Sequence, residues 1–574
     1  YNTVVGDEAG TAITTGDKNT AIGYSSLAAT TTGTDNTALG RNALAANSTG
    51  DRNTASGNAA LGSNTTADSN TATGYGALFT NTTGASNTAV GDSALTANTT
   101  ASNNTAVGYA ALSTNTTGDR LTAVGQSALA ANTTAAYNVA VGDRALLTNT
   151  GSANNVAVGA NALYTFNVGS GDGYNVAVGK NAGFAVTTGV QNTLIGGLAG
   201  DAITTANNNT AVGQAALSAT TTGGSNVAIA TNALGSNTTG ATNVAIGQDA
   251  LFNNTTASNN TAVGHNALVA NTTGSQNTAL GATTLDANTT GENNTALGWS
   301  ALTASTTGSG NTAVGSIALF VNTTGANNVA VGQEAMRYTT TGARNTAVGL
   351  QALYANTTGA ENTALGGSAA ASITTGVYNT VLGYKAGEHS TLLTTGNSNT
   401  LVGSYSRSTT VGSLAANVFG HDVAGAAEYT TIGYGAADIR AAHGIASWAA
   451  VSDERYKKDI VDSTAGLSFI NALQPRTFKY KTLGELPETF NAYKADSTEV
   501  FKNSDTNHGF IAQEVKAAID ADSGLKDGFR LWDDRDDGSQ EVAEAALIPV
   551  LTKAIQELST QLDAALARIT TLEG

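Results

Sequence analysis

One phrase, Asn-Thr-Ala-Val-Gly with its close variants, recurs at a fixed step of 17 residues from Asn2 to Asn399. Asn occupies every position on this lattice except one, where Leu121 stands. The step lengthens to 20 residues at two places, before Asn175 and before Asn399. A self-similarity this strict predicts an array of stacked units, in which each unit contacts its two neighbours.

The consensus unit reads N-T-A-V-G-x-x-A-L-x-x-N-T-T-G-x-x. This length is too short for a pair of helices and suits one coil of two short strands and two turns, so we expect a mainly β solenoid or β-roll. The Gly after each Val supplies a positive φ or lets neighbouring coils approach closely. Stacked coils place like residues over like, so the Asn side chains should form amide ladders along the axis. With a coil spacing of about 4.8 Å, the shaft would be on the order of 115 Å long.

Charge and proline content divide the chain near residue 451. More than half of the charged residues and all three prolines lie in residues 452–574. The sequence therefore predicts a repeat shaft over 1–403, degenerate repeats over 404–451 and a separate C-terminal domain over 452–574. The chain starts within the repeat phase, so we expect a further N-terminal part that attaches the shaft to a particle baseplate or a cell anchor.

Composition excludes several functions. The net charge of −17 argues against nucleic-acid binding, which needs a basic face. No apolar run reaches the length of a membrane span. The absence of Cys excludes disulfides and thiolate metal sites. The acidic turn over 533–538 has Arg535 at the third position of an EF-hand loop, so we expect neither a metal nor a cofactor. The repeats offer no paired carboxylates, which argues against a hydrolase that acts on external glycans.

Each unit offers few bulky apolar side chains, typically one Val and one Leu, such as Val90 and Leu95. That core is thin for a free-standing shaft, and three chains side by side would bury more surface. The pattern resembles the head repeats of trimeric autotransporter adhesins and the shafts of phage tail fibres, although its period is longer than that of adhesin heads. This resemblance implies an extracellular, homotrimeric fibre.

The surface of the shaft allows two interpretations, a passive spacer or rows of Thr and Asn that bind glycans or another surface. Adjacent threonines such as Thr82 and Thr83 cannot share one face of a strand, which argues against ice binding. Residues 404–451 either cap the last coil or contact a receptor, because aromatic side chains suit glycan stacking and interface hot spots. The aromatic and histidine residues of this segment are Tyr405, Phe419, His421, Tyr429, Tyr434, His443 and Trp448.

The segment SDERYKKDI, residues 452–460, opens the C-terminal domain. A Ser hydroxyl becomes a nucleophile when a base removes its proton. Lys457 lies five residues after Ser452, and a lysine whose pKa is lowered by burial can be that base. Attack of the Ser452 hydroxyl on the preceding carbonyl would break the Val451–Ser452 bond.

Three ordered motifs resemble the endosialidase-type intramolecular chaperones across essentially all of residues 452–574. They are SDERYKKDI at 452–460, LSFINALQPRTFKY at 467–480 and HGFIAQEV at 508–515. In that family the Ser-Asp-x-Arg-x-Lys motif opens a domain that cuts itself off. The resemblance implies a catalytic site that includes Ser452, Asp453, Arg455, Lys457, Gln513 and Glu514. The alternative is a domain that keeps the chaperone fold and has lost cleavage, and His508 is either structural or catalytic.

The chain ends in a predicted helix whose apolar residues recur in steps of three and four, which indicates a coiled coil over 548–572. The seam consists of Ile548, Leu551, Ile555, Leu558, Leu562, Ala565, Ile569 and Leu572. The placement of Ile and Leu favours a coiled coil of two helices, whereas the family resemblance implies a coiled coil of three.

A slip of one repeat between chains would keep nearly every shaft contact, so register is weakly specified. A C-terminal trimer would fix register first, and its removal would leave the shaft kinetically stable. We therefore expect a homotrimeric virion tail fibre that attaches to a host glycan or outer-surface protein. Its chaperone would act once, as a Ser-Lys peptidase on its own chain, with no turnover activity. The alternative is a bacterial cell-surface adhesin or extracellular filament with the same release domain.

Overall fold

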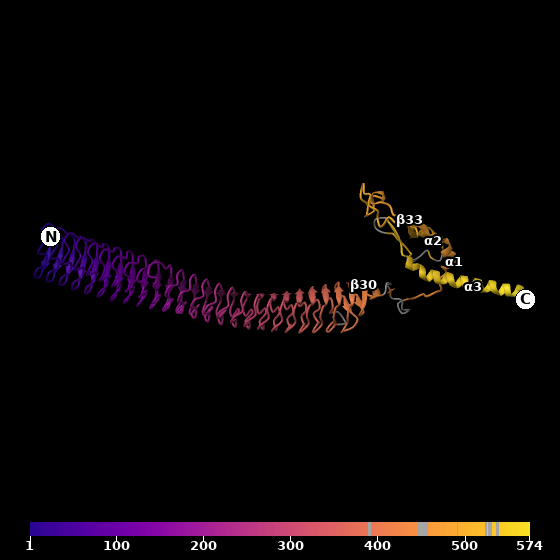
Figure 1. The fold of residues 1–574 in the computed structure, drawn as a ribbon, viewed down its shortest axis with the longest axis horizontal. Coiled ribbons are helices and arrows are strands. Elements are labelled where there is room, and N and C mark those ends of the chain that lie inside the picture. The colour runs from indigo at the N-terminus through magenta and orange to yellow at the C-terminus, as the bar shows by residue number, and fades with distance from the viewer. Residues whose placement is uncertain are drawn as a thin grey trace. The chain divides into compact units, whose positions relative to one another are not determined.

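A computed structural model describes residues 1–388, 392–444, 449–450, 457–490, 492–522, 525, 531–534 and 539–573. The chain divides into two compact units, Tyr1–Val451 and Ser452–Gly574. The first unit is a β-solenoid whose coils stack one upon the next (Figure 1). The second unit is a small α+β domain that ends in a long helix.

Each repeat contributes one strand of three residues, and consecutive strands pair in parallel with the residues of the repeat in register. Thr20 of one strand, for example, pairs with Thr37 of the next, and Ala21 with Ala38. The strands of this stack are β1 (Thr3–Val5), β2 (Thr20–Ile22), β3 (Thr37–Leu39), β4 (Thr54–Ser56), β5 (Thr71–Thr73), β6 (Thr88–Val90), β7 (Thr105–Val107), β8 (Thr122–Val124), β9 (Val139–Val141), β11 (Val156–Val158), β13 (Val176–Val178), β14 (Thr193–Ile195), β15 (Thr210–Val212), β16 (Val227–Ile229), β17 (Val244–Ile246), β18 (Thr261–Val263), β19 (Thr278–Leu280), β20 (Thr295–Leu297), β21 (Thr312–Val314), β22 (Val329–Val331), β23 (Thr346–Val348), β24 (Thr363–Leu365), β25 (Thr380–Leu382) and β26 (Thr400–Val402).

The prediction of two strands in each coil is wrong, because the rest of a typical coil consists of turns. After the strand, every second residue has a left-handed backbone, as at Asn42 (φ 57°) and Leu44 (φ 51°). These positive φ angles prevent the segment from forming a second extended strand. The turns still bond from coil to coil, since the Leu44 N–H donates to the Ala60 carbonyl at 3.0 Å. Two further short strand pairs form elsewhere, between β10 (Ser152–Ala153) and β12 (Gly171–Asp172) and between β27 (Arg407–Ser408) and β29 (Ala424–Gly425).

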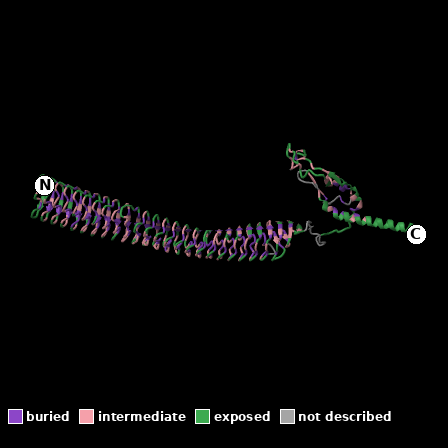
Figure 2. Cartoon of the chain, viewed as in Figure 1, coloured by how far each residue is buried: buried purple, intermediate pink, exposed green. Residues whose placement is uncertain are grey.

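The interior of the solenoid holds the middle residue of the strand, which is Ala in most coils, and the pair that follows the strand, which is typically Ala-Leu. In one coil these are Ala89, Ala94 and Leu95, all with no exposed surface. Figure 2 shows this buried layer running through the stack of coils. Val90, by contrast, is 37% exposed on the outside. Successive side chains of a strand point to opposite faces, so an inward Ala places both of its neighbours outward.

The Gly after the strand, present in every coil of the stack except one, where Ala230 follows β16 with φ 109°, serves both purposes that the sequence suggested. Gly23 has φ +132°, and a Cβ added there would lie 2.6 Å from the carbonyl oxygen of Gly40 in the next coil. A side chain at this position would therefore meet both an unfavourable backbone conformation and a steric clash with neighbouring backbone.

The predicted amide ladder is confirmed. The Asn36 backbone N–H donates to Asn19 Oδ1 at 3.0 Å, and Asn36 Nδ2 donates to the Gly50 carbonyl at 2.8 Å. The same contacts recur along the shaft, and the Asn residues involved are buried. Leu121 breaks the ladder in one direction only, because its N–H still donates to Asn104 Oδ1 at 2.9 Å while its side chain cannot accept a bond from the following coil.

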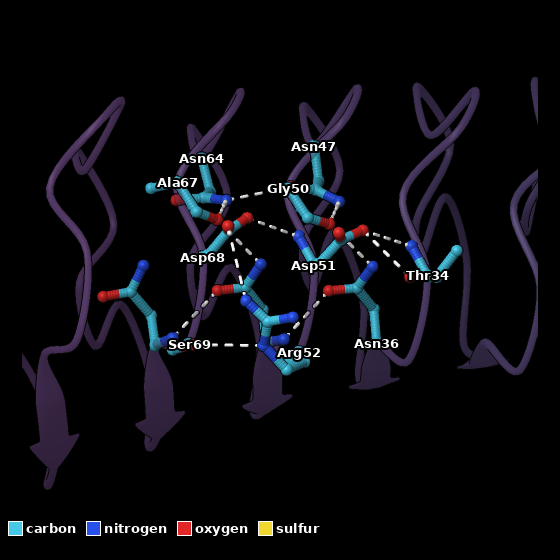
Figure 3. Close-up of polar contacts among 12 residues, drawn as sticks. Thr34, Asn36, Asn47, Gly50, Asp51, Arg52, Asn64, Ala67, Asp68 and Ser69 are labelled. Atoms are coloured by element: carbon cyan, nitrogen blue, oxygen red, sulfur yellow. Dashed lines mark hydrogen bonds and ion pairs between the residues drawn. The ribbon is translucent and has the colours of Figure 1, made fainter.

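A second ladder, also expected from the stacking of like residues, uses the Asn of the N-T-T triplet. Asn64 Nδ2 donates to Asn47 Oδ1 at 2.9 Å and to the Ala67 carbonyl at 3.0 Å. A third, on the outside, uses the residue after N-T-T-G, as where the Thr34 N–H donates to Asp51 Oδ1 at 2.7 Å. Figure 3 shows these contacts in neighbouring coils. Buried amides in a solenoid are tolerated because each finds partners in its own coil and its neighbours.

The solenoid ends in a hairpin. β28 (Asn417–His421) and β30 (Tyr429–Tyr434) continue the parallel stack, with Asn417 opposite Thr430. β31 (Ala437–Ala442) then returns antiparallel along β30, and β32 (Ala449–Ala450) pairs with β31. The reversal covers the edge of β30 that a further coil would otherwise occupy.

Among its described residues, the second unit packs three helices and two small β-pairs. Its elements are α1 (Leu467–Ala472), β33 (Arg476–Phe478), the 3-10 turn η2 (Leu483–Glu485), β34 (Asn507–Gly509), α2 (Ala512–Ala521), β35 (Trp532–Asp534), β36 (Gln540–Val542), the 3-10 turn η3 (Glu544–Ala546) and α3 (Leu547–Glu573). β33 pairs antiparallel with β34, and β35 with β36. The core joins side chains of all three helices, among them Phe469, Val515 and Val550.

Candidate functional site

The predicted cleavage site lies at the junction of the two units. Val451, Ser452, Asp453 and Arg455 fall outside the described residues. Lys457 is described and is exposed to solvent in this chain. The roles assigned to these five residues therefore stay predictions.

The other two predicted site residues lie on the first turn of α2. Gln513 is exposed, and Glu514 is partly buried. The Glu514 carboxylate receives two bonds from the guanidinium of Arg476 on β33, from Nε at 3.0 Å and from Nη2 at 2.8 Å. This bidentate geometry is the strong, orientation-specific form of the Arg–carboxylate pair. Glu514 thus fixes α2 against β33, a contact that the sequence analysis missed.

The ion pair changes the pKa values of both partners in the direction that favours their charged forms. Hydrogen bonds from the Arg476 guanidinium hold the pKa of Glu514 below its usual range. The same bonds raise the pKa of Arg476 above its usual range. Glu514 is therefore an anion across the neutral range, which suits a structural or orienting role better than that of a general acid.

β34 brings the histidine of the HGFIAQEV motif close to this pair. Thr477 of β33 lies opposite His508, and Arg476 lies opposite Gly509. His508 is exposed. The chain then enters α2 within three residues, so the Arg476–Glu514 ion pair joins the hairpin to the first turn of the helix. Because neighbouring residues of a strand point to opposite faces, the side chain of His508, opposite Thr477, lies on the other face of the hairpin from that of Arg476.

The comparisons with known proteins bear on this unit. Residues 452–523 match the family described as chaperone of endosialidase. The match covers the Ser-Asp-x-Arg-x-Lys motif, α1, the β33–β34 pair and α2, so the resemblance seen in the motifs is confirmed for this part of the chain. No curated protein and no solved structure matched the sequence.

α3 follows the matched segment, and it has two different faces. Leu547, Val550 and Ala554 are buried in the core of the domain. Glu557 extends the contact with α1, because its Oε2 accepts the Leu467 N–H at 2.8 Å. This bond caps the start of α1, where Gly466 has no side chain to do so.

The other face of α3 carries the predicted coiled-coil seam, and it is open in this chain. Its large apolar side chains are between 41% and 85% exposed, namely Ile548, Leu551, Ile555, Leu558, Leu562, Ile569 and Leu572. Exposed apolar stripes of this length mark interaction surfaces.

Some of the threonine side chains that were predicted as possible ligand-binding rows form hydrogen bonds within the solenoid. The first Thr of each N-T-T triplet bonds to the next coil, as where Thr82 Oγ1 donates to the Thr99 carbonyl at 3.0 Å. The second Thr, such as Thr83, is exposed. Only one of the two threonine rows is therefore free to meet a ligand.

The aromatic residues near the end of the solenoid also contact one another. The ring centroids of Tyr384 and Tyr405 lie 5.6 Å apart, those of Tyr405 and His421 5.8 Å apart, and those of His421 and Tyr434 5.2 Å apart. Tyr434 is 71% exposed. Trp448 lies outside the described residues. Receptor contact by this segment stays a prediction.

The residues that the structure describes contain neither a membrane-spanning helix nor a metal-binding cluster. No helix there has both the length and the apolarity required to cross a membrane. No group of His, Cys, Asp and Glu side chains there is arranged to hold a metal ion. Residues 535–538 of the acidic turn lie outside that description.

Proposed function

We propose that this chain is a homotrimeric, extracellular fibre whose β-solenoid shaft attaches a virion to a host surface and whose C-terminal chaperone sets the register of the three chains. The observation that carries the proposal is the position of the chaperone match, which starts at residue 452, where the solenoid unit ends. A repetitive shaft needs a separate device for register, because a slip of one repeat costs little.

The open face of α3 supports self-association as the chaperone's mode of action. Three parallel copies would bury the exposed seam of Ile and Leu side chains in a coiled coil. The receptor of the shaft would be a glycan or an outer-surface protein, met by the exposed threonine row or by the aromatic residues near Tyr434.

We further propose that the chaperone is released by cleavage of the Val451–Ser452 bond. The Ser452 hydroxyl attacks the Val451 carbonyl carbon while Lys457 accepts the hydroxyl proton. The bond between the Val451 carbonyl carbon and the Ser452 nitrogen then breaks, and the nitrogen leaves as an amine that takes the proton back from Lys457. Water hydrolyses the ester between Val451 and the Ser452 oxygen, which gives the Val451 carboxylate and a free Ser452 with its hydroxyl restored. Lys457 is exposed in this chain, whereas a lysine that acts as a base needs a lowered pKa. In this proposal the assembled trimer supplies the burial, so cleavage follows assembly.

The test of cleavage is denaturing electrophoresis with N-terminal sequencing of the purified protein, beside Ser452→Ala and Lys457→Ala. We expect a wild-type fragment that begins at Ser452 and is absent from both variants. Lys458→Ala is the matched control, because it removes the neighbouring exposed lysine and should leave cleavage unchanged. An intact wild-type chain would refute release and leave the domain as a retained cap.

The test of assembly is light scattering of the cleavage-deficient Ser452→Ala protein, with and without Leu558→Lys. A lysine in the centre of the α3 seam should prevent trimer formation, whereas Gln561→Lys on the same helix should not. A monomeric parent protein would refute the proposed trimer.

A further inference from the structure

The solenoid carries an open apolar surface of its own, in addition to the exposed apolar face of α3 in the other unit. The third residue of each strand points outward, and together these residues form a continuous row, here called the outer stripe. In the three-residue strands of the main stack, from β1 to β26, the row is Val, Ile or Leu except in β4 and β5, where Ser56 and Thr73 stand. Ile246 is 37% exposed, Leu280 46% and Leu365 47%.

This surface is unusual for a parallel sheet. Parallel sheets in proteins are generally covered on both faces, and their outward side chains are apolar only where another layer packs against them. Here the coil itself covers the inner face of the sheet. On the outer face, the first residue of each strand gives a row of Thr or Val, and the third residue gives the outer stripe. A long apolar row without a cover indicates an interaction surface.

The periodicity of the outer stripe restricts what can cover it. A partner that follows the stripe along the shaft must present apolar groups at the spacing of the coils, about 4.8 Å. Another copy of this chain, parallel and in register, has that spacing over the whole length.

The area of the outer stripe is comparable with that of a protein interface. Ile246 and Leu280 are exposed by a third to a half, whereas valines of the stripe such as Val107 are less exposed. A Val or Leu side chain offers about 60–120 Å² of apolar surface, so about 10–50 Å² stays open per coil. Over the apolar coils this amounts to about 200–1,100 Å² per chain, a range that includes the ~800 Å² per partner of a standard protein interface.

The two polar positions of the stripe, Ser56 and Thr73, distinguish the aligned register of neighbouring copies from a shifted one. In copies aligned residue by residue, Ser56 and Thr73 face their own counterparts and leave the apolar row continuous. A slip of one coil would place one of these hydroxyls against Leu39 or Val90 of a neighbour, and a buried hydroxyl without a hydrogen-bond partner is unfavourable. The shaft therefore contains some register information of its own.

We infer that the outer stripe is where the shafts of the three copies pack together, in parallel and in register. This inference rests on the proposed trimer and adds the surface through which the shafts touch. It also explains why Val, Ile and Leu, rather than polar residues, occupy an outward position of so many strands.

Site-specific disulfide formation tests the inference in the full chain, which contains no native Cys. Ile246→Cys places one thiol on the outer stripe, and Thr256→Cys places one on an exposed turn of the same coil as a matched control. A disulfide needs Cα atoms within about 7 Å, so a bond between identical positions reports register to about one coil. Leu280→Cys repeats the test two coils further along.

After mild oxidation, denaturing electrophoresis should show a covalent dimer for Ile246→Cys and Leu280→Cys. Part of the chain should remain monomeric, because only two of three cysteines around a threefold axis can pair. Thr256→Cys should give no dimer. Light scattering of the same samples separates the two proposals. If the protein is a trimer but forms no disulfide at the stripe positions, the inference is overturned and the proposed trimer stands. The same holds if Thr256→Cys forms as much disulfide-linked dimer as the stripe variants. Monomers would overturn both.

Discussion

The buried Asn ladder allows one stability effect to be worked out from individual bonds. Asn243 Nδ2 donates to the Ala257 carbonyl at 2.9 Å and to Asn226 Oδ1 at 3.2 Å, and its Oδ1 accepts the Asn260 N–H at 3.0 Å. We consider Asn243→Leu, since Leu121 shows that a coil accommodates Leu at this position.

Most of the groups that Asn243 contacts keep a partner after the substitution. The Ala257 carbonyl still accepts from Asn254 Nδ2 at 3.0 Å, and Asn226 Oδ1 still accepts the backbone N–H of residue 243 at 2.9 Å. Only the Asn260 N–H loses its acceptor. A buried N–H without a partner costs about 1–3 kcal/mol, so the local stability should fall by that amount and not by the sum of three bonds.

Amide hydrogen exchange measured by mass spectrometry is the suitable assay, because a repeat array unfolds locally and has no single unfolding free energy. The Asn260 amide and its coil should exchange roughly 5 to 150 times faster in Asn243→Leu. Asn253→Leu, which changes an exposed Asn of the same coil, is the control and should have no measurable effect. Equal exchange in the two variants, or a loss of protection throughout the shaft, would refute the bond-by-bond reasoning.

Three further outcomes are expected. Gly247→Ala should destabilise its coil by at least about 1–3 kcal/mol, measured by local hydrogen exchange, because the Gly has φ +133° and the new Cβ would lie 2.5 Å from the next coil's carbonyl oxygen. Glu557→Ala should weaken the start of α1 by about 0.5–2 kcal/mol, seen as faster exchange of the Leu467 amide, because it removes the carboxylate that accepts that N–H. Arg476→Ala should raise the pKa of Glu514 toward its ordinary value, observed by NMR titration of the carboxylate.

The pH dependence of the last prediction has a definite sign. A carboxylate whose folded pKa is depressed stabilises the fold above its unfolded pKa, and that contribution disappears as the pH falls through the folded pKa. Glu514 should therefore keep its contribution at neutral pH and lose it only in acid, and Arg476→Ala should abolish the contribution at every pH.

Each of the three outcomes has a control. Gly197→Ala should be nearly neutral, since a Cβ there meets no atom within 4 Å. Glu557→Gln keeps an oxygen acceptor and should retain most of the α1 cap. Lys494→Ala removes a more exposed ion-pair partner and should leave the Glu514 titration unchanged. A full effect in any control would contradict the corresponding explanation.

The sequence predicted those features of the shaft that follow from repetition alone. Any group that recurs at every coil must lie over its own copy, so the Asn ladder and the close approach at Gly23 could be inferred from the period. The outward direction of Val90 was missed because the period does not say which residues of a three-residue strand face inward. The structure shows that the middle residue faces inward, usually Ala but Leu or Val at Leu194, Val381 and Leu401, so that the residue after it, such as Val90, faces outward.

The candidate site was less predictable. The motifs identified the chaperone segment and pointed to Gln513 and Glu514, but the ion pair with Arg476 depends on a contact between residues 38 positions apart. The Q-P-R-T-F sequence was visible as part of a family motif and gave no sign of its partner. In the same way, the cap of α1 by Glu557 joins residues 90 positions apart, and no local pattern predicts it.

The parallel pairing of each strand with the strands of the two adjacent repeats has a consequence for how such a fibre can change over time. Because a coil bonds to its two neighbours and to nothing farther away in the stack, the gene can gain or lose whole repeats without disturbing the remaining core. The reach of the fibre then changes in steps of about 4.8 Å, one coil at a time. The chaperone domain need not change, since the residues before it in the sequence stay the same. If the chain attaches a particle to a host as proposed, the distance between them is a property that selection can adjust by copying and deleting 17-residue units.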